Sequence, residues 1–235
     1  MDAHSVYTSG KYLDRNETWH AEDSPWKANQ IYDMIVKNGL KPLAIDEVGC
    51  GVGVILKELS RKPILLDTTF RGLDISPQAI EIAKAERTAN IEFICQDITT
   101  DVTRHADLLL VIDVFEHVPD YWGFLAACRA HATYKVYHIP LDINVSSVVR
   151  DTSDKFRAKL GHIHLFSAAS ALATLRDTGH EILDVKYTCG AISLFRHHPS
   201  LKRALVNVPR WLLGTMSVPL AARVFGGYSL LVLTT

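Results

Sequence analysis

Acidic residues and glycines stand where apolar stretches of the chain end. The apolar run that begins at Leu43 leads into Glu47, which is followed by Gly49, Gly51 and Gly53. Because glycine has no Cβ atom, a backbone at these positions can turn tightly and lie against a ligand. A carboxylate at the end of the run can accept a hydrogen bond from an amine or a hydroxyl. The segment therefore predicts a ligand site formed by backbone and carboxylate together.

Three later acids occupy similar positions. Asp74 ends a second apolar run, Asp97 follows a third in Gln96-Asp97-Ile98, and Asp113 follows the apolar run 107–112. Asp74, at the end of the second apolar run, can hold both hydroxyls of a ribose. Asp97 or a neighbouring amide can contact the amino group of an adenine. The glycine spacing G-x-G-x-G departs from the G-x-G-x-x-G of dinucleotide binders, which disfavours NAD.

These residues can form one site only if the fold brings them to the same edge of a sheet. We expect strands at Leu43–Val48, Phe70–Asp74, Ile91–Cys95, Asp107–Ile112, Tyr134–Ile139, Glu181–Tyr187 and Tyr228–Thr234. Helical patterns lie between most of them: one begins at Ser24-Pro25, with Ser24 as N-cap, and ends at Asn38-Gly39, and others cover Val52–Ser60, Ser76–Arg87, Pro119–Ala132 and the stretch from Ser167 to Thr178. Strands that alternate with helices predict an α/β fold, a Rossmann-like and mostly parallel seven-stranded sheet with helices on both faces. Ligands of such sheets bind beyond the carboxyl ends of the strands.

Length and composition fit a single domain. The chain has 235 residues, is 48% apolar and 22% charged, and has a net charge of −1. We divide it into an N-terminal cap (1–39), a core (40–190), an insertion or lid (190–227) and a last strand (228–235). The stretch 141–166 is polar and is expected to be an irregular loop. Four scattered cysteines and a polar N-terminus without a signal region favour the cytoplasm.

The motifs Glu47–Gly53, Gly72–Ser76, Gln96–Ile98 and Val114–Pro119 together resemble the class I S-adenosylmethionine (SAM)-dependent methyltransferases, in particular those related to ubiquinone biosynthesis (the type 11–12 group). The resemblance covers about residues 40–190. It implies SAM as cofactor, an antiparallel last strand, and an N-terminal aromatic segment folded over the cofactor. It further implies that Glu47 and the glycines flank the methionine part, that Asp74 binds the ribose, that Asp97 and Ile98 bracket the adenine, and that Asp113 and Phe115 border the sulfonium. The predicted cofactor residues are Glu47, Gly49, Cys50, Gly51, Gly53, Asp74, Ile75, Asp97, Ile98, Asp113, Phe115, Tyr12 and Trp26.

Methyl transfer requires alignment of donor and acceptor and a place for the acceptor's proton. A base near neutral pKa points to histidine. His138 closes the fifth strand, His164 precedes a helix and His117 follows the fourth strand. We take these three as the catalytic candidates, His138 and His164 ahead of His117.

No resident metal is predicted, but one alternative stays open. Asp113, Glu116 and His117, joined by His162 or His164, offer carboxylate and imidazole ligands for a divalent ion. A similar arrangement, with Glu at the first position, is used by the small-RNA 3′-end methyltransferases, where the metal holds a ribose diol.

The expected acceptor is a small molecule or a sugar in a biosynthetic pathway, methylated on oxygen or nitrogen. The near-neutral charge argues against nucleic acid. No acidic residue follows Asp184, and the insertion 190–227 interleaves basic and apolar residues, so contact with a membrane surface or a lipid-linked acceptor is an alternative. A non-catalytic SAM-binding subunit is another. The sequence does not indicate an oligomeric state.

Overall fold

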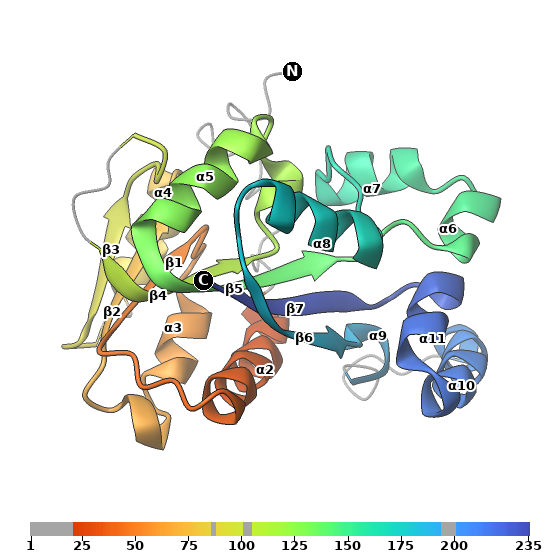
Figure 1. Cartoon of the computed structure of the whole chain (residues 1–235), viewed down its shortest axis with the longest axis horizontal. Helices are drawn as coiled ribbons and strands as arrows, with labels where there is room; N and C mark the ends of the chain where they lie inside the picture. The colour runs from red at the N-terminus through yellow and green to blue at the C-terminus, as the bar shows by residue number, and fades with distance from the viewer. Residues whose placement is uncertain (1–20, 86–87, 101–104, 194–200) are drawn as a thin grey trace.

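Seven strands form one sheet in this computed structural model, which describes residues 21–85, 88–100, 105–193 and 201–235 (Figure 1). The strands are β1 (Ala44–Val48), β2 (Thr69–Asp74), β3 (Ile91–Cys95), β4 (Ala106–Ile112), β5 (Ala132–Pro140), β6 (Ile182–Thr188) and β7 (Ser229–Thr234). Their order in the sheet is β3-β2-β1-β4-β5-β7-β6. The pairs among β1 to β5 are parallel, whereas β7 runs antiparallel to both β5 and β6. The predicted fold class and the antiparallel last strand are confirmed.

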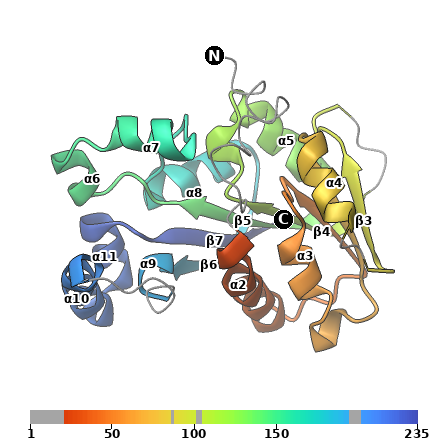
Figure 2. The same ribbon diagram turned by 180° about the vertical axis from the view of Figure 1, so that it is seen from behind.

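Helices cover both faces of the sheet. α2 (Ser24–Lys37), α3 (Val54–Leu59) and α4 (Pro77–Ala85) lie in front of the sheet in Figure 2, and α5 (Tyr121–His131) and α8 (Ala168–Asp177) lie in front of it in Figure 1. Each layer seals its own apolar core, the first around Ile31 and Leu56 and the second around Leu125 and Leu175. β4 lies between the two cores, and its residues 108–111 are wholly buried, as expected of a central parallel strand.

Local signals set most helix ends, with two corrections. Ser167 caps α8 through the predicted contact, its hydroxyl accepting from the Ser170 amide. The prediction of Ser24 as an N-cap is wrong, because Ser24 is already helical and Asp23 precedes it. The helix expected from Pro119 begins only at Tyr121, after the short 3-10 helix η3 (Phe115–His117), because the Asp120 carboxylate accepts from the Gly123 amide and caps α5 there.

The stretch 141–166 is more ordered than expected. It contains α6 (Val145–Val149) and α7 (Ser153–Leu160), so the prediction of an irregular loop is wrong over these residues. Asn144 and Ser147 form a reciprocal capping box at the start of α6. Gly161, at a φ of 78°, ends α7. The missed signal was this pair of caps, which is hard to see in a polar sequence.

The insertion is helical over its described residues. α9 (Gly190–Ser193), α10 (Leu201–Met216) and α11 (Val218–Phe225) lie together beyond the β6–β7 end of the sheet (Figure 1). α11 buries Ala221 and Ala222 in the second core. α10 instead leaves a group of apolar side chains exposed: Leu205, Val208, Trp211, Leu212 and Met216. Within the described residues, no helix combines the length and apolarity that crossing a membrane requires.

A buried ionic cluster joins the sheet to α5. Asp46 on β1 accepts hydrogen bonds from the guanidinium of Arg71 on β2 and from Nε2 of His131, which lies 2.6 Å from Asp46 Oδ2. All three side chains are buried. Burial alone would raise the pKa of Asp46, but the hydrogen bonds from His131 and Arg71, with the charge of Arg71, outweigh it and leave that pKa lowered.

Candidate functional site

One large cavity lies at the carboxyl ends of β1 to β5, with a volume of about 1440 Å³. Glu47, Asp74, Asp97, Asp113 and His138 each reach it from a different strand or the residues just after that strand. The sheet order explains the convergence, because parallel strands present their carboxyl ends at one edge. The edge that the sequence predicts as a ligand site is therefore a real cavity.

The glycine turn forms the floor of one half of this cavity. Gly49 and Gly51 have φ values of 70° and 53°, a region that favours glycine. A Cβ atom on Gly49 would come within 2.6 Å of Val114 Cγ2. The Asp74 carboxylate accepts from the Gly51 amide at 2.9 Å and from the Ser76 amide at 2.8 Å. Asp74 therefore both faces the cavity and holds the turn.

In the half of the cavity formed by the glycine turn, Glu47 is unusual because it is a buried acid. Its side chain lines the cavity and is 1% exposed, yet its Oε2 atom has no hydrogen-bond partner among the described residues. Burial, with the nearby charge of Asp74, raises its pKa well above the ordinary value, although Lys27 opposes the shift. A buried carboxyl oxygen without a partner is costly, so Glu47 is suited to accept a donor or cationic group of a ligand in the cavity.

The remaining predicted cofactor residues divide into three groups. Cys50, Ile75, Asp97, Ile98, Asp113 and Trp26 line the cavity. Phe115 and Gly53 are not among the lining residues: Phe115 packs against Phe166 in the second core, and a Cβ on Gly53 would come within 2.3 Å of the Phe93 ring. The requirement for glycine at position 53 thus comes from packing beneath the turn. Tyr12 lies outside the described residues.

Asp113 lines the cavity and contacts two other lining residues, Lys27 and His138. Its backbone has a φ of 55°, which is uncommon for a residue with a side chain. One carboxylate oxygen lies 2.7 Å from Lys27 Nζ and the other 2.6 Å from His138 Nδ1. Burial would raise the pKa of Asp113, but the charges of His138 and Lys27 and their hydrogen bonds lower it strongly, so this carboxylate is ionised.

Sequence reasoning missed Lys27, although a signal was present. Lys27 lies four residues before Ile31 and seven before Met34, and both of those side chains are buried. A lysine on the apolar face of a helix requires a carboxylate partner. Arg210 and Asp142 also line the cavity without having been predicted. Their positions depend on the insertion and on the loop after β5, for which the sequence offered no spacing rule.

The three predicted catalytic histidines differ in their surroundings. Both ring nitrogens of His138 are engaged, Nδ1 with Asp113 and Nε2 with Thr188 Oγ1 at 3.0 Å. His164 is not among the lining residues, and its Nε2 lies 3.0 Å from the Val118 carbonyl. His117 lines the cavity, and its Nδ1 lies 3.0 Å from the Gly161 carbonyl.

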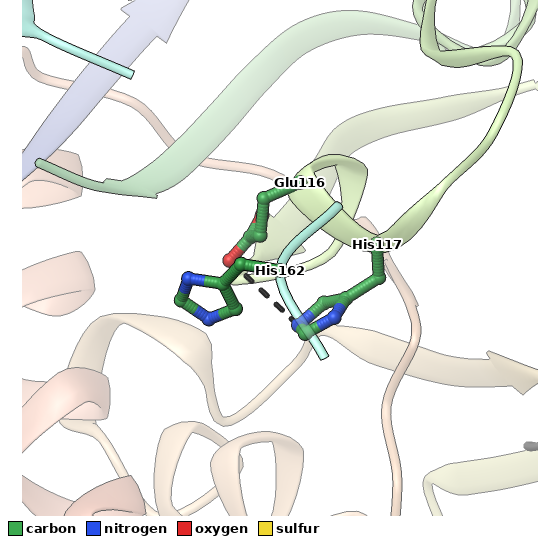
Figure 3. A group of neighbouring side chains, drawn as sticks. All are labelled: Glu116, His117 and His162. Atoms are coloured by element: carbon green, nitrogen blue, oxygen red, sulfur yellow. Dashed lines mark ion pairs between the residues drawn. The ribbon is translucent and has the colours of Figure 1, made fainter. Parts of the chain in front are cut away.

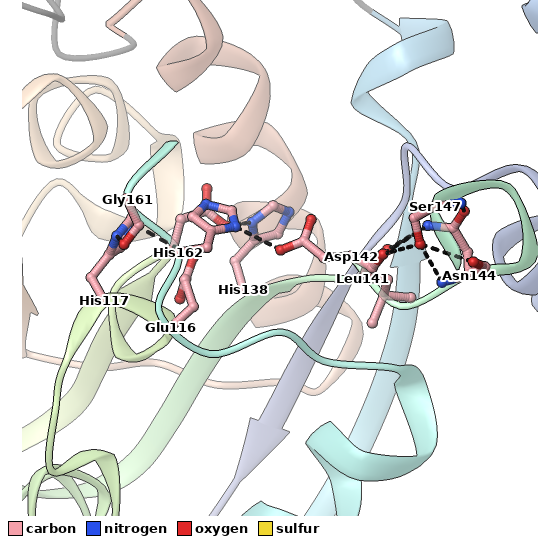
Figure 4. A network of polar contacts seen from close by, with 10 residues as sticks. Glu116, His117, His138, Leu141, Asp142, Asn144, Ser147, Gly161 and His162 are labelled. Atoms are coloured by element: carbon pink, nitrogen blue, oxygen red, sulfur yellow. Dashed lines mark hydrogen bonds and ion pairs between the residues drawn. The ribbon is translucent and has the colours of Figure 1, made fainter. Parts of the chain in front are cut away.

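His162 shares the far end of the cavity with His117. Its Nδ1 lies 2.6 Å from Asp142 Oδ2, and its ring stands 4.9 Å from that of His117 (Figure 4). Burial, with the neighbouring His162, lowers the pKa of His117 to about 4, so the His117 imidazole is neutral at physiological pH. Of the predicted metal-binding set, the structure brings together Glu116, His117 and His162.

Comparison with known proteins agrees with this geometry. A family model described as a methyltransferase domain matches residues 47–134, which include the glycine turn and β2 to β4. The match covers the part of the chain that carries the glycine turn and less than half of the 235 residues. The ubiquinone biosynthesis O-methyltransferase of Coxiella burnetii is 32% identical over 97 residues, and that of Nitrosomonas europaea is 25% identical over 113 residues. The matched part of the chain spans only 39% and 46% of the lengths of these two curated relatives.

Solved structures show the same fold along nearly the whole chain. The plantazolicin methyltransferase BpumL, solved with a monoazolic desmethyl analogue and S-adenosylhomocysteine (SAH), has a TM-score of 0.62 at 17% identity and aligns with 99% of this chain and 92% of its own. The magnesium protoporphyrin IX methyltransferase of Synechocystis PCC 6803, solved with SAH, has a TM-score of 0.57 at 16% identity over 94% of this chain and 85% of its own. At this identity the likeness establishes the fold of the chain and no more.

Proposed function

We propose that this chain transfers a methyl group from SAM to an oxygen or nitrogen atom of a small-molecule or sugar acceptor. The observation that carries the proposal is the single cavity that contains both Glu47 and the Asp113–His138 pair. Its volume of about 1440 Å³ exceeds the ~300–1,000 Å³ of an ordinary pocket for one ligand, and so leaves room for a cofactor and an acceptor. All four cysteines are free, which favours a cytoplasmic site of action.

The residues of the glycine half fit SAM. Glu47 Oε2, which lacks a partner, is suited to the ammonium of the methionine part. The Asp74 carboxylate is suited to the ribose hydroxyls, and Asp97 with Ile98 to the adenine. When bound, SAM supplies a methyl group on a positively charged sulfur, and the acidic lining of this half favours that charge.

The other half must align the acceptor. The acceptor lone pair forms a bond to the methyl carbon as the carbon–sulfur bond breaks, and the acceptor proton leaves to water or to a protein group. We assign His138 the role of a positioning residue, because both its ring nitrogens are engaged and one of them holds Asp113. Lys27 and His138 together keep the Asp113 carboxylate ionised and fixed beside the cofactor half.

Ligand-induced stabilisation tests the cofactor assignment. SAM and SAH at about 100 times their Kd are expected to stabilise the fold by about 2.7 kcal/mol. For a chain of this size that corresponds to a rise in Tm of roughly 5–10 °C. NAD is expected to leave the Tm unchanged, and a rise with NAD alone would overturn the proposal. Turnover is then followed as SAH release with a panel of hydroxyl and amine acceptors. SAM binding without turnover of any acceptor would favour a non-catalytic SAM-binding subunit.

The exposed apolar face of α10 supports a second candidate, an acceptor held at a lipid surface. Trp211 and Leu212 are each more than half exposed, and Met216 more so. We expect the protein to float with anionic vesicles at low salt and Trp211→Ser to reduce the floated fraction. Ile64→Ser, at an exposed apolar position on the 3-10 helix η2 (Pro63–Leu65), is the control and should float like the parent. A parent protein that remains in the soluble fraction would exclude this candidate.

A further inference from the structure

Glu116, His117 and His162 form a compact group at the wall of the cavity. One ligand atom from each residue lies within 4.8 Å of the others. Figure 3 shows the Glu116 carboxylate and the two imidazole rings gathered around one space. His117 and His162 also line the large cavity, so the group borders the space proposed for the cofactor and the acceptor.

The Glu116 carboxylate is the strongest indication that something is missing there. The residue has no exposed surface, and neither carboxylate oxygen has a hydrogen-bond partner among the described residues. His117 Nε2 lies 4.0 Å from Glu116 Oε1, but the lowered pKa of His117 leaves this imidazole neutral. A fully buried carboxylate without hydrogen bonds is costly unless a cation accompanies it.

In both histidines, a contact to Nδ1 fixes the orientation of the ring. His117 Nδ1 faces the Gly161 carbonyl at 3.0 Å, and His162 Nδ1 faces the Asp142 carboxylate at 2.6 Å (Figure 4). With Nδ1 engaged in each ring, Nε2 is the candidate ligand atom of both histidines. Metal-binding histidines in proteins are commonly held in this way, by a carbonyl or a carboxylate on the other nitrogen.

From these contacts we infer that Glu116, His117 and His162 bind one divalent transition-metal ion, which in turn binds a hydroxyl oxygen of the acceptor. Two imidazoles and one carboxylate suit borderline ions such as Mn²⁺, Fe²⁺, Co²⁺ and Zn²⁺ and leave coordination positions open. Asp113 is not part of this set, because Lys27 and His138 occupy its oxygens. His164 does not belong to the group of closely spaced ligand atoms, and it does not line the cavity.

The ion would also supply what the catalytic histidines lack. His138 has no ring nitrogen to spare, and His164 is not among the lining residues. A metal-bound hydroxyl loses its proton to water more readily, and the resulting oxygen attacks the methyl carbon as the carbon–sulfur bond breaks. This part of the inference rests on the proposed methyl transfer and selects an oxygen acceptor over nitrogen.

Metal binding is measured on the full chain after chelator treatment, by calorimetry with Mn²⁺ and by the visible spectrum of added Co²⁺. We expect one ion per chain. Glu116→Gln and His162→Asn each remove a ligand and should weaken metal binding by about 100-fold or more. Asp142→Asn removes the partner that orients His162 and should weaken metal binding by roughly 10- to 100-fold. The matched control is His164→Asn, two residues from His162 but outside the group, which should bind the ion like the parent.

SAH calorimetry on the same proteins separates the possible failures. Every variant should retain SAH binding, which also shows that it is folded. If SAH binds but no ion binds at millimolar concentration, or if Glu116→Gln and His162→Asn bind the ion like the parent, the metal site is refuted and the methyltransferase proposal stands. If SAH fails to bind the parent protein, the proposed function itself is refuted.

Discussion

Glu47→Gln is expected to weaken SAH binding by about 2–4 kcal/mol, roughly 30- to 1,000-fold, because it removes the charged partner of a buried ammonium. The structure provides the reason: the carboxylate is buried in the cavity wall, and its Oε2 atom has no protein partner. Isothermal titration calorimetry measures the loss. Glu92→Gln, an exposed carboxylate on β3 outside the cavity, is the control and should bind SAH like the parent. Equal affinities of Glu47→Gln and the parent would refute the assignment.

The same substitution should affect the stability of the ligand-free protein in the opposite direction. Because the pKa of Glu47 is raised in the folded chain, the folded state of the parent holds this proton more tightly than the unfolded state does. The free energy of unfolding of the parent therefore falls as pH rises above the unfolded pKa of about 4.3 towards the folded one. Glu47→Gln removes this dependence, so its advantage should grow with pH. Urea unfolding without SAH at several pH values measures the difference.

Asp46→Asn, one residue earlier, is expected to destabilise the fold by about 3–5 kcal/mol, because it leaves a buried Arg71 without its carboxylate. Its effect on SAH binding should be small, since Asp46 does not line the cavity. Asp33→Asn is the control, because Asp33 is also ion-paired but is exposed, and that variant should stay within about 0.5 kcal/mol of the parent.

The pH dependence of Asp46→Asn provides a second check. The pKa of Asp46 is lowered by folding, so its contribution is complete above its unfolded pKa of about 3.9 and is lost as pH falls through the folded pKa. The difference in unfolding free energy between parent and variant should therefore be constant near neutrality and shrink below about pH 4. A difference that persists unchanged in acid would show that the ion pair is not its source.

The sequence contained enough information for the sheet and for the cofactor half. Strand positions followed from apolar runs such as 107–112, because a central parallel strand is buried on both faces and reads as unbroken apolar sequence. The convergence of Glu47, Asp74, Asp97 and Asp113 followed from topology, because each acid lies at or just past the carboxyl end of a parallel strand. Apolar runs and the acids that follow them are local in sequence, so they can be recognised without knowing any long-range contact.

Only the tertiary structure decided what each polar residue does. Asp46 and Glu47 are adjacent acids on one strand, and the alternation of side chains sends one into an ion pair with Arg71 and the other into the cavity. Nothing in the local sequence separates the roles of these two acids, and the sequence did not identify Lys27 at all.

The alternative metal ligands were likewise left open among several residues, and the folded loop after β5 brings the side chain of His162, and not that of His164, into one group with Glu116 and His117. Gly53 and Phe115 were predicted at the cofactor, yet packing against Phe93 and Phe166 governs them. Residue types and spacing determined the edge of the sheet at which the chemistry lies, because that depends on strand order. Which partner each side chain meets depends on contacts between segments distant in sequence, and only the folded chain brings those together.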